Sequence, residues 1–112
     1  MNTIGRLGEQ LARKHLEDSD YLFVEANYHT RYGEIDLIMR DTNGYVFVEV
    51  KTRQENNAIA PNDNLSESKL EKMEASINAY LEENDDKASW RAALIGVTVF
   101  PNGMAKIHMM DL

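Results

Sequence analysis

Two short motifs carry charged side chains whose types and spacing suit metal chemistry: Gly-Glu-Ile-Asp-Leu-Ile at residues 33–38 and Val-Glu-Val-Lys at residues 48–51. The charged residues that they contribute are Glu34, Asp36, Glu49 and Lys51. Carboxylate oxygens are the ligands that magnesium and manganese prefer in proteins. These residues form a candidate site if the fold brings the two motifs together.

The segments that carry the motifs, residues 33–40 and 45–53, are predicted to pair as an antiparallel hairpin. Both segments alternate in period two and are rich in β-branched and aromatic residues, and Asn43-Gly44 between them is a strong hairpin signal. The hairpin therefore predicts that the two motifs lie side by side.

The length of the hairpin loop decides which residues face each other. With a two-residue loop, Asn43-Gly44, Asp36 lies opposite Lys51; with a four-residue loop, 41–44, Asp36 lies opposite Glu49. In both registers the charged residues share one face, and only an odd loop or a bulge would separate them. The residues predicted to share that face are Glu34, Asp36, Glu49 and Lys51.

The other face of the hairpin is apolar and is predicted to be buried against another layer. Its residues are Ile35, Leu37, Met39, Val46, Val48 and Val50. On the charged face, three carboxylates converge on one lysine. Like charges at that spacing raise carboxylate pKa values and destabilise the fold unless a cation lies among them. A divalent ion, Mg²⁺ or Mn²⁺, is the expected cofactor.

The whole chain sets broader limits. Its 112 residues suggest one domain, spanning 1–112, and the absence of cysteine excludes disulfides, thiolate metal sites and cysteine nucleophiles. Residues 1–5 have no apolar signal core, and no apolar run is long enough to span a bilayer. We expect a cytoplasmic protein with no membrane partner.

The net charge of −7 is uneven: residues 1–53 hold seven Lys/Arg against nine Asp/Glu, and residues 54–112 hold five against ten. Non-specific affinity for nucleic acid comes mostly from phosphate neutralisation by Lys and Arg, so this balance is unfavourable for such a partner. A local basic rim is still expected beside the hairpin, where Arg31, Arg40 and Arg53 can meet phosphates.

Hydrophobic periodicity predicts an α/β fold with the order α-β-β-β-α-β-β and a mixed sheet flanked by helices. The predicted elements are a helix from a Thr3 cap to about Glu17, strands over 21–28, 33–40 and 45–53, a helix over 65–83, and strands over 90–100 and 104–110. A capping box at Asn64 starts the second helix. The polar segment 54–64 is predicted to be a disordered loop, or else a lid.

Two further charged residues belong to the candidate site. Glu9 falls near the edge of the apolar stripe of the first helix, and Lys69 lies near the start of the second. Lys69 can point either toward the hairpin or into solvent. Both residues are therefore accessory candidates beside the two motifs.

Taken together, these motifs resemble the YraN-like family of small bacterial proteins, which is similar to the Holliday-junction resolvases of the PD-(D/E)xK nuclease superfamily. The resemblance covers most of the chain and is most specific over residues 33–53. The matching runs are Gly8-Glu9-x-x-Ala12, Asn27, Gly33-Glu34-Ile35-Asp36-Leu37-Ile38 and Val46-Phe47-Val48-Glu49-Val50-Lys51-Thr52-Arg53.

The resemblance implies a restriction-endonuclease-like core and a metal-dependent nuclease. It implies that Asp36 and Glu49 bind the metal, that Glu9 completes the acidic site, and that Lys51 orients or activates the attacking water. One or two Mg²⁺ ions would then polarise the scissile phosphate and lower the pKa of a bound water. The implied substrate is DNA or another structured nucleic acid, including branched DNA, and related resolvases act as two-fold dimers.

Two alternatives stay open. The first is a non-catalytic module that binds nucleic acid or protein, since His29 stands where the family commonly has arginine, and Arg91-Ala92-Ala93 stands where it tends toward Arg-Phe-Asp. The second is a charge cluster that only tunes solubility. Cleavage assays and metal titration separate these interpretations from the nuclease.

Overall fold

The computed structural model describes residues 3–55, 65–84 and 86–112, and its elements follow the predicted order. In chain order they are α1 (Thr3–Asp18), β1 (Leu22–Thr30), β2 (Gly33–Asp41), β3 (Gly44–Gln54), α2 (Glu67–Glu83), β4 (Trp90–Val99) and β5 (Ala105–Asp111). The strands form one five-stranded sheet in the order β1-β2-β3-β4-β5. β3 and β4 pair in parallel and the other neighbours are antiparallel, which confirms the mixed sheet.

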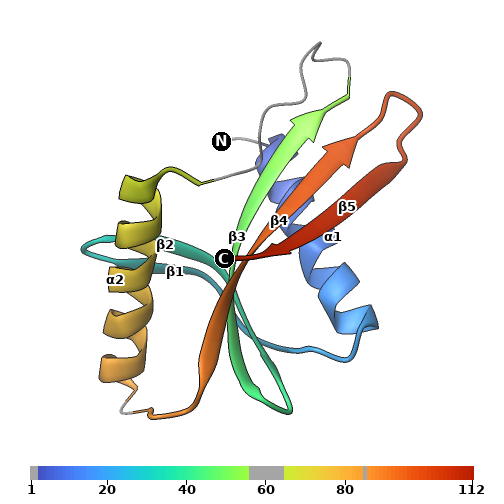
Figure 1. Cartoon of the computed structure of the whole chain (residues 1–112). Helices are drawn as coiled ribbons and strands as arrows, with labels where there is room; N and C mark the ends of the chain where they lie inside the picture. The colour runs from blue at the N-terminus through green and yellow to red at the C-terminus, as the bar shows by residue number, and fades with distance from the viewer. Residues whose placement is uncertain (1–2, 56–64, 85) are drawn as a thin grey trace.

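The sheet lies between the two helices, with α1 on one face and α2 on the other (Figure 1). The α1 side buries Leu16 with Leu37, Val46, Val48 and Ile95. The α2 side buries Ile77 and Tyr80 with Ile38, Phe47 and Leu94. A parallel strand pair at the centre of a sheet requires cover on both faces, because the connection between its strands brings a helix onto the sheet. Neither helix in this described part of the chain is long and apolar enough to cross a membrane.

The prediction that one hairpin face is core and the other carries charge is wrong in part. Both faces are buried near the hairpin loop, where Tyr45 and Phe47 pack under α2. On β3, charged side chains begin only at Glu49, beyond the aromatic residues that pack against α2. Ile35 also packs on the α2 side rather than beside Leu37. The alternation of charged and apolar residues correctly predicted the end of the hairpin away from the loop. It did not predict the second core, which lies near the loop.

The hairpin loop is Thr42-Asn43, because Asp41 pairs with Gly44. The pairing that follows, Arg40 with Tyr45 and then Leu37 with Val48, is the register of the four-residue-loop alternative. The Asn43 N–H donates to Asp41 Oδ1 at 2.8 Å, which fixes the turn.

Gly44 is expected to be intolerant of a side chain. Its φ is +134°, and a Cβ there would lie 2.1 Å from the Ser89 carbonyl oxygen, which accepts the Tyr45 N–H. We predict that Gly44→Ala lowers the free energy of unfolding by about 2 kcal/mol, from backbone strain plus the clash. Gly103→Ala is the matched control, because Gly103 has φ +86° with nothing within 4 Å of its Cβ position. If Gly44→Ala and Gly103→Ala lower the free energy of unfolding equally in denaturant melts, the predicted clash with Ser89 is refuted.

The start of α2 corrects the predicted cap. Ser66 is the N-cap, and its Oγ accepts the Lys69 N–H at 3.1 Å. Asn64, the predicted cap, lies outside the described residues, as does nearly all of the predicted loop 54–64. The cap fixes where the first turn of α2 begins and so where Lys69 points.

Candidate functional site

The candidate site begins with a break in the alternation of β2. Leu37 packs toward α1, whereas Ile35, two residues earlier, packs toward α2. The intervening residue is Asp36, and the corresponding position on β1 is Asn27, whose φ of +54° is left-handed. Non-glycine residues adopt this conformation rarely, and asparagine tolerates it better than most. Because the alternation is broken here, the Asp36 side chain does not follow the regular alternation between the two faces of the sheet.

Asp36 instead reaches sideways toward β3. The β2–β3 ladder runs from the loop to Leu37 opposite Val48, and beyond it the Asp36 Oδ2 accepts the Val50 N–H at 2.8 Å. A side-chain oxygen thus takes a bond that the ladder would otherwise supply. Figure 1 shows β1 and β2 bending toward α2 while β3 continues with β4 and β5. Asp36 lies at this divergence and is only 8% exposed.

The surroundings of Asp36 raise its pKa to about 7. Burial is the largest cause, since it penalises the charged carboxylate, and the negative charges of Glu49, Glu9 and Glu34 add to it. The hydrogen bond from Val50 opposes the shift. Carboxylates from α1, β2 and β3 therefore act electrostatically on Asp36.

Glu9 comes to this cluster because α1 packs unusually close to β3. A Cβ on Gly8 would lie 1.7 Å from Thr52 Oγ1, so only glycine permits the approach. Burial and the charges of Glu34 and Glu49 raise the pKa of Glu9, and a hydrogen bond with the Asn27 side chain opposes the rise. Asn27, the residue of β1 with the left-handed φ, therefore also holds Glu9.

Glu49 and Lys51 lie on the α2 side of β3. The Glu49 side chain is 12% exposed, and its Oε2 lies 3.1 Å from Lys69 Nζ. Period-two alternation puts Lys51 on the same side, because Val50 and Thr52 face α1. Lys69 points toward the hairpin, the first of its two predicted orientations.

The structure brings some of the other predicted residues to the site and leaves others away from it. Glu34 contributes to the charge around Asp36, and its Oε1 lies 3.3 Å from His29 Nε2. Arg31 lies beside this region, in the β1–β2 turn. Arg40 stacks on Tyr45, roughly 13 Å along β2 from Asp36 at 3.3 Å per residue. Arg53 lies near the opposite end of β3 from the hairpin loop.

The donors around Asp36 fit a hard divalent cation in type, because they are all carboxylates and repel one another. In the ranges that the structure describes, no three His, Asp or Glu side chains are grouped closely enough to hold an ion. The Glu49 oxygen that contacts Lys69 would have to leave that pair to become a ligand. The donor chemistry fits, and the side chains do not form a closed cage.

Asn27 is a further candidate residue of the site and lies outside both charged motifs. It contacts Glu9 and adopts the strained φ beside Asp36. Its sequence signal is the residue type itself, since asparagine is depleted in strands and β1 is otherwise rich in aromatic and aliphatic residues. Backbone strain of this kind tends to occur at functional sites.

Comparison with known proteins places the chain in a family. The model of the uncharacterised protein family UPF0102 matches residues 8–97. A UPF0102 protein of Chlorobium chlorochromatii is 38% identical over 109 residues, covering 97% of this chain and 84% of that protein. A UPF0102 protein of Flavobacterium johnsoniae is 33% identical over 114 residues, covering 98% and 93%. The matched span includes both charged motifs, and the chain belongs to the UPF0102 family.

Proposed function

We propose that the protein is a metal-dependent nuclease that hydrolyses a phosphodiester bond of DNA or another structured nucleic acid. The observation that carries the proposal is the buried Asp36 carboxylate, whose Oδ2 accepts the Val50 N–H and whose pKa the negative charges of Glu49, Glu9 and Glu34 help to raise. Packing does not require this arrangement, because like charges around a buried acid destabilise the fold. The sequence resemblance to PD-(D/E)xK nucleases supports the same conclusion.

In this proposal Asp36 and Glu49 hold Mg²⁺ or Mn²⁺, and Glu9 completes the acidic site. The bound ion would supply a polarised phosphoryl oxygen and a water of lowered pKa. Lys51 projects from β3 two residues after Glu49, where a fixed ammonium can orient the attacking water and stabilise charge on the phosphate. The Val50 N–H holds Asp36 in place through its hydrogen bond.

A panel of labelled linear, flapped and four-way-junction DNA tests the proposal. We expect manganese-dependent cleavage by the wild type and at least a hundredfold lower cleavage rate in Glu49→Ala. Mutation of residues that only hydrogen-bond to metal ligands already lowers activity about 10- to 100-fold. Glu83→Ala is the control for loss of a carboxylate, because Glu83 bonds Tyr28 at the other end of α2. Wild-type protein that cuts nothing in the panel would refute the nuclease.

A non-catalytic binding module is the alternative, and the Glu49–Lys69 pair favours it, because that pair already neutralises one carboxylate. Its distinguishing result is nucleic-acid or protein binding that survives Asp36→Asn without a metal requirement. Magnesium that fails to raise the melting temperature of the wild type would point the same way, since an ion that binds the folded state stabilises it.

A further inference from the structure

A cleft of about 350 Å³ opens beside Glu49, between the first turns of α2 and the β1–β2 turn. Lys69 and Lys72 line it from α2, and Tyr32 lines it from the turn. Glu34 and Glu49 connect it to the carboxylates around Asp36. The cleft thus has a cationic wall and an aromatic wall next to the candidate metal ligands.

We propose that this cleft binds one unpaired nucleotide of a single-stranded nucleic acid segment, with a phosphate on the two lysines and a base on Tyr32. The inference names the substrate class of the nuclease proposed above and rests on that function. It predicts that the protein engages a single-stranded end, flap or loop rather than a continuous duplex.

The two lysines are arranged to meet an anion. Lys69 and Lys72 are three residues apart on α2, so they lie on one side of the helix. The Lys69 side chain is 54% exposed while its Nζ contacts Glu49. Lys72 forms no ion pair with any residue that the structure describes. Its ammonium is therefore available to a phosphate without breaking an existing bond.

Tyr32 supplies a surface for a base. The residue is 40% exposed, and the Arg31 guanidinium lies 4.9 Å from its ring centroid. Its turn is tied to α2, because Thr30 Oγ1 lies 3.0 Å from the buried Ser76 Oγ and accepts the Tyr32 N–H at 3.0 Å. Bases stack on such rings whatever their identity, and an adjacent arginine adds to the interaction.

The same features disfavour a duplex. The bases of a duplex stack on one another, so their ring faces are covered. Only an unpaired base can stack on the Tyr32 ring. A duplex is held mainly by many phosphate contacts, and a chain with a net charge of −7 offers few. One nucleotide in a small cleft requires only the lysines that are present there.

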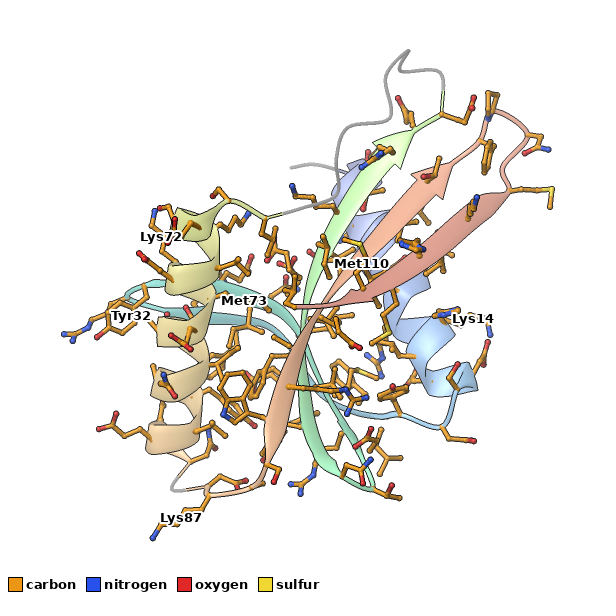
Figure 2. All side chains as sticks on the ribbon, viewed as in Figure 1. Lys14, Tyr32, Lys72, Met73, Lys87 and Met110 are labelled. Atoms are coloured by element: carbon orange, nitrogen blue, oxygen red, sulfur yellow. The ribbon has the colours of Figure 1, made fainter. Side chains whose placement is uncertain are left out.

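Lys87, labelled in Figure 2, serves as a control for the two lysines of the cleft. Lys72 lies at the end where α2 begins and Tyr32 lies beside the middle of the helix, whereas Lys87 lies beyond the far end. Lys87 is exposed and does not line the cleft. Lys87→Gln therefore removes the same charge from the protein without touching the proposed site.

Fluorescence anisotropy with a labelled single-stranded 12-mer and a blunt duplex of the same sequence tests the inference, with metal chelated to prevent metal-dependent cleavage. We expect the single strand to bind more tightly. Lys72→Gln should weaken single-strand binding by about fivefold and reduce the slope of log affinity against log salt by about 0.7. Tyr32→Leu should weaken it by about tenfold. Lys87→Gln should change neither the affinity nor the slope.

Duplex that binds as tightly as single strand, or Lys72→Gln that behaves like Lys87→Gln, would overturn the inference. Thermal melts of each variant show whether the fold is intact, and Lys72 has no partner in the described structure whose loss would disturb it. Cleavage that persists when binding is indifferent to these variants would leave the nuclease standing and remove only the cleft. Binding that depends on the cleft residues, without any cleavage, would support the nucleotide-binding cleft and refute the nuclease.

Discussion

Asp36→Asn is expected to abolish metal-dependent cleavage and, at pH 8, to raise the free energy of unfolding by about 2 to 4 kcal/mol. The asparagine keeps an oxygen that can accept the Val50 N–H, and it removes the buried charge that Glu9, Glu34 and Glu49 oppose. A pKa raised from 3.8 to about 7 corresponds to roughly 4 kcal/mol at 1.36 kcal/mol per unit, an upper bound for a site whose charges relax together.

The stability gain depends on pH in a defined direction. Because the folded pKa of Asp36 lies above its unfolded value, the folded state holds the extra proton between them, and the wild type loses stability as pH rises from about 4 to 7. The difference between Asp36→Asn and the wild type should be near zero at pH 4 and largest at pH 8. Urea melts across this range measure it.

Asp41→Asn is the matched control on the same strand. Asp41 accepts a hydrogen bond from Arg91 at 3.0 Å, and bonds from Asn43 and Arg91 hold its pKa below the usual range despite the opposing effect of burial. Its removal should therefore destabilise the protein at pH 8, with the opposite sign. Asp36→Asn that also destabilises at pH 8 would refute the prediction, because it would mean that the folded protein stabilises the Asp36 carboxylate instead of opposing its charge.

Gly8→Ala is expected to lower the free energy of unfolding by about 3 kcal/mol. Helix propensity alone would favour alanine by up to about 1 kcal/mol. The new Cβ, however, would lie 1.7 Å from Thr52 Oγ1 and 2.8 Å from Thr52 Cβ, so α1 must move away from β3. Overpacking of this kind typically costs 1 to 3 kcal/mol, and the contact is severe. Chemical denaturation measures the loss.

The partner residue makes this prediction specific. Thr52→Ala removes the oxygen in the closest contact, so the double variant Gly8→Ala/Thr52→Ala should recover part of the stability, and the double-mutant cycle should show coupling. The displaced helix also carries Glu9 away from Asp36, so the Asp36 pKa should fall in Gly8→Ala. Additive losses would show that α1 and β3 do not meet at these residues.

Much of the fold could be predicted from the sequence because its signals are local. Period-two alternation and the Asn-Gly pair located the hairpin, and apolar spacing located both helices. The sequence could not show that Tyr45 and Phe47 form a second core, because period two places them on the same face of the strand as the charged Glu49 and Lys51. That assignment depends on α2, which comes later in the chain.

The candidate residues were predicted by type, and their arrangement was not. Two of the carboxylates that act on Asp36, Glu34 and Glu49, belong to the two motifs, and the third, Glu9, was an accessory candidate. Regular period-two alternation, however, would have placed the Asp36 side chain on one face of the sheet. The break at Asp36 and Asn27 instead turns the side chain toward Val50, a backbone event that only the paired strands reveal. The Glu49–Lys69 contact likewise depends on the Ser66 cap, which sets the phase of α2.

The parallel pairing of β3 with β4 has a kinetic consequence. It joins each residue to one forty-five positions later, from Tyr45 with Trp90 to Gln54 with Val99. The entropy of closing that loop must be overcome before the pairing is formed, whereas the β1–β2–β3 meander needs only short closures. The early folding nucleus should therefore be the N-terminal meander, and the rate of folding should be governed by the arrival of β4 at its edge.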